Sequence, residues 1–132
     1  MELGQRIIRD HVELRAQLDR VRSLKDGLSI QNELRSLSKA LAEHFAREEE
    51  GGYLAFVIER SPWLAVRVQI LGSQHAEIRA TLVGLIEVAS DPDRFAHLTE
   101  GLQRFFDRLH AHERAETEII QECLYEDLAG AD

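Results

Sequence analysis

Six side chains able to bind a metal stand at positions where the period of an amphipathic helix favours leucine. They recur in a repeated order, one histidine followed by a histidine and a glutamate four residues apart: His11, His44, Glu48, His75, His112 and Glu116. Residues four apart lie on one face of a helix, about 6 Å apart along its axis. The sequence therefore predicts that each glutamate shares an inward-facing surface with the histidine before it.

A single histidine on an apolar helix face is more often a hydrogen-bonded core residue than a ligand. Six titratable groups in one buried layer are different. An unpaired buried charge costs several kcal/mol, whereas a whole domain has only about 5 to 15 kcal/mol of net stability. A pair of divalent cations removes this cost. Imidazole and carboxylate without thiolate suit iron, manganese or zinc, and two carboxylates between two histidine pairs suit two bridged metals.

The elements that position these groups are predicted to be four helices, since apolar residues recur at alternating steps of three and four. The first helix is expected over 2–25, and the second is expected to begin after Ser29 as its N-cap. The glycine pair 51–52 is expected to bend the second helix without ending it. Ser61-Pro62 and Asp91-Pro92 each combine an N-cap with proline at the first helical position, and they open the third and fourth helices.

Helices joined by such short connections must lie antiparallel to their neighbours. The expected fold is therefore all-α, an up-down-up-down four-helix bundle with the metal site in its core, forming a single domain over 1–132. A pair of long hairpins that completes a bundle only by dimerising is an alternative, so the chain is expected as a monomer or a homodimer. Residues on antiparallel neighbours lie level when they are equally far from the turn, and the midpoints of successive histidines fall near residues 27, 59–60 and 93. The four histidines are therefore expected in one layer.

Composition narrows the classes of protein to which the chain can belong. The formal net charge of -8 argues against nucleic acid and anionic membranes as partners. The longest apolar stretch, 53–58, is far shorter than the roughly 20 residues of a membrane span, and no export signal is visible. The single cysteine, Cys123, excludes an internal disulfide and a cysteine-based metal cage within one chain, which fits a cytoplasmic location.

Four other polar or reactive residues are assigned less direct roles. Glu49 is expected at the surface, as a reserve carboxylate if the glycine pair distorts the second helix. His97 and His110 fall off the apolar stripe and are expected in solvent. Cys123 is expected to be a small buried core residue.

The chain also carries a faint internal repeat, in which 10–18 matches 74–82 and 41–48 matches 109–116. With this order of ligands, the sequence resembles the hemerythrin-like (HHE cation-binding) proteins from about His11 to Glu116. The resemblance implies an oxo- or hydroxo-bridged non-haem centre of two iron ions per chain, with manganese or zinc as alternatives. It also implies that the four histidines are terminal ligands and that Glu48 and Glu116 are bridging carboxylates.

Oxygen-carrying hemerythrins have a further histidine on the third helix and an aspartate on the fourth. Here those positions hold Arg79 and Thr117. This departure argues against reversible oxygen transport, and the two irons are expected to be nearly equivalent, both with accessible coordination. The set of four histidines and two glutamates is similar to the metal-binding domain of the iron-sulfur cluster repair di-iron proteins.

The function implied by the resemblance is binding of, or reaction with, a small oxidant in stress response or sensing. The expected partners are a diatomic gas (dioxygen or nitric oxide) or peroxide, together with an electron donor that the sequence does not identify. The alternative function is iron handling, or iron-sulfur cluster repair by iron donation, without turnover of a substrate. The ligands alone do not decide whether the chain is an enzyme.

Overall fold

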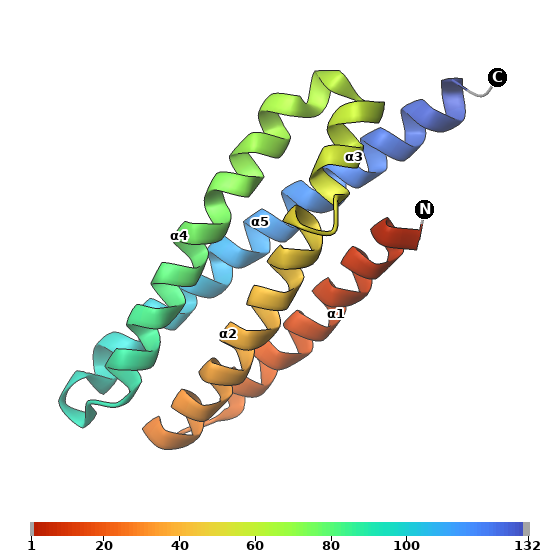
Figure 1. Ribbon diagram of the computed structural model, residues 1–132. Coiled ribbons are helices and arrows are strands. Elements are labelled where there is room, and N and C mark those ends of the chain that lie inside the picture. The colour runs from red at the N-terminus through yellow and green to blue at the C-terminus, as the bar shows by residue number, and fades with distance from the viewer. Residues whose placement is uncertain (1, 131–132) are drawn as a thin grey trace.

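The computed structural model describes the backbone of residues 2–130 and the side chains of residues 4–124. Four long helices run alternately up and down: α1 (Glu2–Ser23), α2 (Gly27–Glu49), α4 (Ala65–Ala89) and α5 (Phe95–Gly130). The short helix α3 (Tyr53–Arg60) follows α2, and 3₁₀ turns at Pro62–Leu64 and Pro92–Arg94 lead into α4 and α5. No strand occurs within residues 2–130. The predicted all-α, up-down-up-down bundle is confirmed (Figure 1).

The second helix differs from the prediction at both ends. It begins at Gly27, because the Asp26 side chain caps it by accepting a hydrogen bond of 2.8 Å from the backbone N–H of Ser29. The glycine pair ends α2 instead of bending it. Gly52 has a φ of 84°, a left-handed conformation that glycine adopts without steric cost, so the chain turns before α3 begins.

The proline dipeptides open short 3₁₀ turns and not the long helices themselves, so α4 begins at Ala65 and α5 at Phe95. The side chain of Asp91 caps its turn by accepting a hydrogen bond of 3.0 Å from the Asp93 N–H, as predicted. Ser61 makes no such side-chain bond. The first helix ends at Ser23, two residues earlier than predicted.

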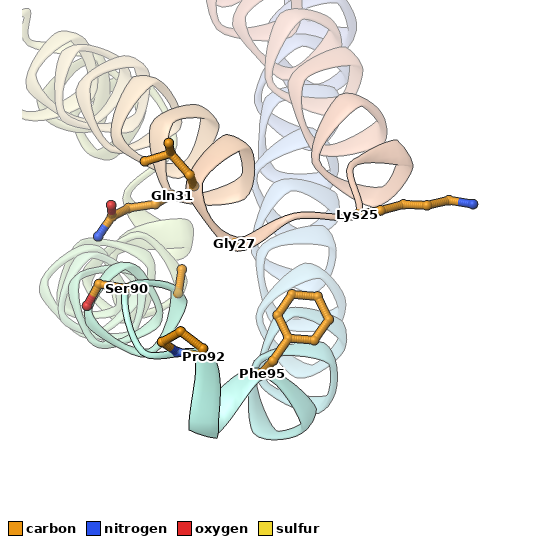
Figure 2. Close-up of a pocket in the computed structure, with 8 residues that line it drawn as sticks. Lys25, Gly27, Gln31, Ser90, Pro92 and Phe95 are labelled. Atoms are coloured by element: carbon orange, nitrogen blue, oxygen red, sulfur yellow. The ribbon is translucent and has the colours of Figure 1, made fainter.

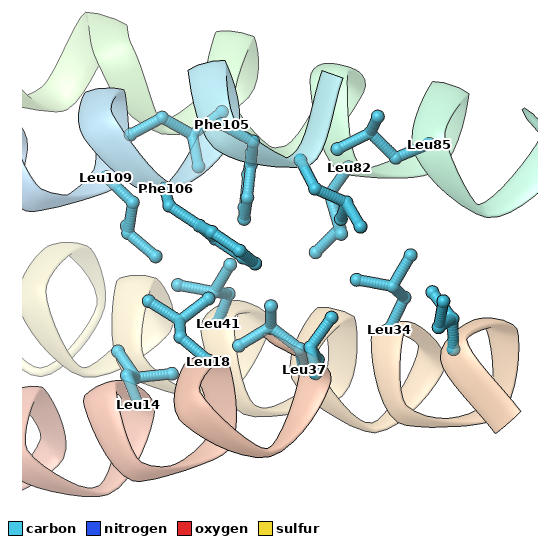
Figure 3. Packing of buried hydrophobic residues seen from close by; sticks show 14 of the residues in the cluster. Leu14, Leu18, Leu34, Leu37, Leu41, Leu82, Leu85, Phe105, Phe106 and Leu109 are labelled. Atoms are coloured by element: carbon cyan, nitrogen blue, oxygen red, sulfur yellow. The ribbon is translucent and has the colours of Figure 1, made fainter. Parts of the chain in front are cut away.

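The apolar core consists of two clusters. In the larger one, leucines of α1 and α2, including Leu37, face Leu82 of α4 and Phe105 of α5 (Figure 3). The smaller cluster lies nearer the chain ends and includes Ile7 and Val57. On α1, α4 and α5 the predicted histidine stands between residues of the two clusters. On α2, His44 follows Leu41 of the larger cluster, and the smaller cluster begins after α2, at Tyr53 of α3. The histidine layer therefore has apolar packing on both sides, which strengthens electrostatic interactions within it.

At the end of the bundle opposite α3, the connection between α1 and α2 lies against the connection between α4 and α5 (Figure 2). A Cβ at Gly27 would stand 2.9 Å from the carbonyl oxygen of Ala89, so glycine permits this approach. A pocket of about 470 Å³, lined by Lys25 and Phe95 among others, lies at this end. The larger apolar cluster separates the pocket from the histidines. Within the described part of the chain, none of the helices combines the length and apolarity needed to cross a bilayer.

Candidate metal centre

The four predicted histidines come together as two pairs, one from each hairpin of long helices. The ring centroids of His11 on α1 and His44 on α2 are 5.0 Å apart, and those of His75 on α4 and His112 on α5 are 5.1 Å apart. Both pairs are arranged edge to face, and all four side chains are buried. The histidines thus lie in one layer, as their spacing from the turns predicts.

The two predicted glutamates lie between these pairs. Oε1 of Glu48 is 2.5 Å from Nε2 of His44, and its Oε2 is 3.2 Å from Nε2 of His75. Oε1 of Glu116 is 3.0 Å from Nε2 of His112 and 3.4 Å from Nε2 of His11. Each carboxylate therefore reaches a histidine of both pairs, and all six predicted side chains meet.

These facing atoms fit metal ions better than they fit one another. Nε2 of every histidine in the layer and both oxygens of Glu48 and Glu116 are buried without a hydrogen-bond partner in the described residues. Buried polar atoms without partners are rare because they lose the free energy of hydration. Potential ligand atoms within 4.8 Å of one another form two groups that share Glu48: His11, His44, Glu48 and Glu116, and Glu48, His75 and His112. Their nitrogen and oxygen atoms suit divalent transition metals that share a carboxylate.

The charges in this layer are strongly coupled. Burial alone would lower the pKa of His44, but Glu116 and Glu48 outweigh burial and raise it to about 10. Burial, aided by the charge of Glu116, raises the pKa of Glu48 against the effects of His44 and His75. Burial acts in the same direction on Glu116, yet its histidine neighbours hold its pKa well below the ordinary value. A cation that binds here must therefore displace protons.

Three of the four histidines are held from behind by residues that the sequence analysis missed or placed elsewhere. Asp10 accepts a hydrogen bond of 2.9 Å from Nδ1 of His44, and Gln74 accepts one of 2.7 Å from Nδ1 of His112. Glu49 accepts a bond of 2.6 Å from Nδ1 of His75. A hydrogen bond at Nδ1 orients the ring and leaves Nε2 to face a metal. Glu49 is half exposed, as predicted, but it supports a histidine and does not reach into the layer.

The internal repeat contained the signal for two of these partners. Asp10 and Gln74 occupy the same position in the two matched segments, and each bonds to the histidine of the next long helix. Asp10 is 3% exposed, and Arg47 covers it with an ion pair of 2.8 Å. Burial of Asp10 and its bonds with His44 and Arg47 oppose each other, and the bonds keep its pKa below the ordinary value.

A comparison with models of protein families identifies the family of this chain. A family model described as Hemerythrin HHE cation binding domain matches residues 4–124. The chain belongs to this hemerythrin family. No curated protein and no solved structure gives a significant match. Family membership and the buried histidine–glutamate cluster together identify a metal-binding protein.

Residues outside the cluster also agree with their predicted places. Arg79, which stands where a hemerythrin oxygen carrier has a further histidine, is exposed. His97 and His110 are exposed, and Cys123 is a buried free cysteine. Tyr53 was not predicted at the site, but it is buried and its hydroxyl lacks a partner in the described residues. Burial, together with the charges of Glu116 and Glu48, raises the pKa of Tyr53.

The residues around the two histidine pairs are unequal, whereas the near equivalence of the two irons stays a prediction. Phe45 follows His44, and its ring stacks on His75 at a centroid distance of 3.9 Å and an interplanar angle of 10°. Glu113 follows His112 in the same way, so a buried carboxylate takes the place of the aromatic ring. The hemerythrin layer thus has an aromatic wall in one half and an acidic wall in the other.

Proposed function

We propose that the chain holds two iron ions in the histidine layer and reacts with a small oxidant, in stress response or sensing. The observation that carries this proposal is the orientation of Glu48, whose two oxygens face His44 and His75 in different pairs. A carboxylate with one oxygen toward each of two ligand sets suits a pair of metals bridged through it. Glu116 also reaches both pairs, but through a single oxygen, Oε1, which faces His11 and His112.

The chain's own residues would determine the reactivity. The four histidines and two glutamates supply six side chains for two ions, which leaves coordination positions for an oxidant. Two ferrous ions, when bound, supply the two electrons that reduce the O–O bond of one peroxide, with two protons, to water. The apolar clusters on both sides exclude water from the layer.

Metal analysis combined with an electronic spectrum tests this function. Protein purified without added metal is expected to contain about two irons per chain and to absorb in the near ultraviolet when oxidised. Anaerobic mixing of the reduced protein with peroxide or nitric oxide should change this spectrum. His75→Ala should abolish the response, whereas His97→Ala, at an exposed histidine of α5 away from the layer, should leave it intact. Iron-free protein that gains no spectrum on addition of ferrous iron would refute the proposal.

Iron handling is the second candidate function. Glu49, whose carboxylate supports His75, has 50% of its side chain exposed, so one hydrogen bond separates this histidine from a group in solvent. Such a position suits exchange of a metal with a carrier. Fast loss of iron to a weak chelator, without reaction with peroxide or nitric oxide, would favour this function over the first.

A further inference from the structure

A pocket of about 300 Å³ lies between α1 and α5 beside the histidine layer. It is lined by Ile8, His11, Val12 and Arg15 of α1 and by His110, Glu113, Arg114 and Thr117 of α5. Both arginines are exposed. The seam between α1 and α5 is the loosest of the four seams of the bundle. Because His11 and Glu113 are buried whereas Ile8, Val12 and His110 are exposed, the pocket leads from the surface to the proposed metal site.

The inner wall of this pocket carries a buried carboxylate that has no hydrogen-bond partner in the described residues. Glu113 is 3% exposed, and neither of its carboxylate oxygens has a hydrogen-bond partner in the described residues. The nearby hydroxyl of Thr117 donates instead to the backbone carbonyl of Glu113, at 3.0 Å. A carboxyl group keeps acceptor oxygens in either protonation state, and buried acceptors require donors. A molecule inside the pocket can supply them.

The other sides of the layer differ from this pocket. In the first half of the chain the place equivalent to Glu113 is filled by Phe45, which stacks on His75. A smaller pocket of about 130 Å³ reaches His44 between α1 and α2. There the carboxylate of Asp10 is already bonded to His44 and Arg47. The pocket between α1 and α5 thus combines space with a carboxylate that lacks a hydrogen-bond partner in the described residues.

The chemistry of the pocket selects among small oxidants. Dioxygen and nitric oxide carry no hydrogen-bond donor, and they need a volume closer to the roughly 30 Å³ of one water than to that of the pocket. A peroxide has an O–H group to donate. Ile8 and Val12 add an apolar surface at the rim, and hydrogen peroxide has no apolar group to pack against it. A molecule with a hydroperoxyl group at one end and a short alkyl group at the other matches both walls.

We propose that this pocket binds a small alkyl hydroperoxide, whose O–H donates to Glu113 beside His11 and whose alkyl group packs on Ile8 and Val12. The proposal rests on the function proposed above, because it assigns the oxidant and its route to the same layer. Glu113 would then be a substrate-binding residue on the acidic side of the layer, next to His11. Two ferrous ions held by the layer would supply two electrons, and the O–O bond of the hydroperoxide would be reduced with two protons to one alcohol and one water.

Two matched tryptophan variants test the route. Val12→Trp obstructs the rim of the pocket, whereas Val66→Trp puts the same side chain on α4, and the two valines are 63% and 68% exposed. Each protein is loaded with ferrous iron under anaerobic conditions and mixed with tert-butyl hydroperoxide, and iron oxidation is followed by absorbance. We expect Val12→Trp to slow oxidation about tenfold, the equivalent of one lost hydrogen bond, and Val66→Trp to match the unmodified chain.

Substitutions of Glu113 test the role of its carboxylate. Glu113→Leu removes both acceptors with little change in volume, and it should leave thermal stability unchanged or higher because it removes a buried unpartnered charge. Oxidation by tert-butyl hydroperoxide should slow about tenfold, while the rate with nitric oxide stays the same. Glu113→Gln, which keeps one acceptor, should restore part of the rate. Lower stability of Glu113→Leu, or equal slowing with nitric oxide, would show a structural role and overturn the proposal.

Binding to the pocket is also measured without iron chemistry. Nuclear magnetic resonance titration of the chain as purified with tert-butyl alcohol, the unreactive analogue, should shift signals of residues 8–15 and 110–117 and leave them unshifted in Val12→Trp. If the chain binds no iron or reacts with no oxidant, the function proposed above is wrong, and this titration still decides whether the pocket takes such a ligand. An absence of shifts there, or equal oxidation rates of Val12→Trp and Val66→Trp, would overturn the proposal.

Discussion

The carboxylate of Asp10 on α1 accepts a hydrogen bond of 2.9 Å from Nδ1 of His44 on α2, and so it ties the two helices together directly behind the histidine layer. Arg47 and Arg6 pair with the same carboxylate at 2.8 Å and 3.4 Å. Gln74 repeats the bond in the second half, where it holds His112. The layer therefore depends on a second set of residues that is itself fixed by ion pairs and hydrogen bonds.

Asp10→Ala is expected to weaken metal binding about 10- to 100-fold, because the ring of His44 loses the acceptor that orients it. Competition with a coloured chelator measures this affinity. Asp19→Ala removes an exposed acid from the same helix and serves as the control. Equal affinity of the two variants would show that Asp10 does not orient the ligand.

Glu48→Ala or Glu116→Ala should reduce iron content far below that of Glu49→Ala or His110→Ala. Each removes a carboxylate that reaches both histidine pairs, whereas Glu49 only supports one histidine from outside. Iron per chain is measured after purification, and circular dichroism checks that the helices persist. A larger loss in Glu49→Ala would mean that Glu49, and not Glu48, is the shared ligand.

Removal of the metal should lower the heat stability of the chain, and ferrous iron added back should restore it. A ligand that binds only the folded state stabilises it by mass action, by about 2.7 kcal/mol at a hundredfold excess over Kd. The midpoint of thermal unfolding, followed by circular dichroism with and without iron, measures the effect. Unchanged midpoints over a wide range of iron concentration would contradict binding at the buried layer.

The reduced, iron-loaded chain is expected to oxidise in air within minutes, without a long-lived oxygen adduct. Arg79 stands where a carrier has its further histidine, and its side chain is exposed, so this position adds nothing to the layer. The pocket between α1 and α5 also gives small molecules a path to His11. Stopped-flow mixing with air measures the reaction. An adduct that releases its gas under argon through repeated cycles would restore the carrier function.

Much of this site follows from helical periodicity. Polar residues at leucine positions, equally far from the turns, predict that His11, His44, His75 and His112 lie level, because rise per residue is nearly constant along a helix. The burial of Asp10 is harder to predict, since it depends on how α1 is rotated against α2 and on Arg47 covering it. In the sequence, Asp10 is simply an acid next to a histidine, and many exposed residues look the same.

Helical periodicity does not predict two further features, the end of α2 and the position of Glu113 at the site. The end of α2 depends on the φ of 84° at Gly52, and a glycine pair in a sequence is compatible with either a bend or a break. The role of Glu113 emerges when the two halves are superimposed as a repeat, because its partner position holds Phe45. The internal repeat is recognised by the residues that match between the halves, whereas the asymmetry of the site comes from the pair that does not match, Phe45 and Glu113.

Phe45 and Glu113 also bear on how the layer acquires its ions. A cation beside a stacked aromatic ring and a cation beside a buried carboxylate meet different electrostatic fields, so two ions bound here would differ in affinity. We would then expect sequential loading, with a partly filled intermediate when metal is scarce. The ion at the weaker position would change with the supply of divalent ions, which would allow a mixed-metal form of the same chain.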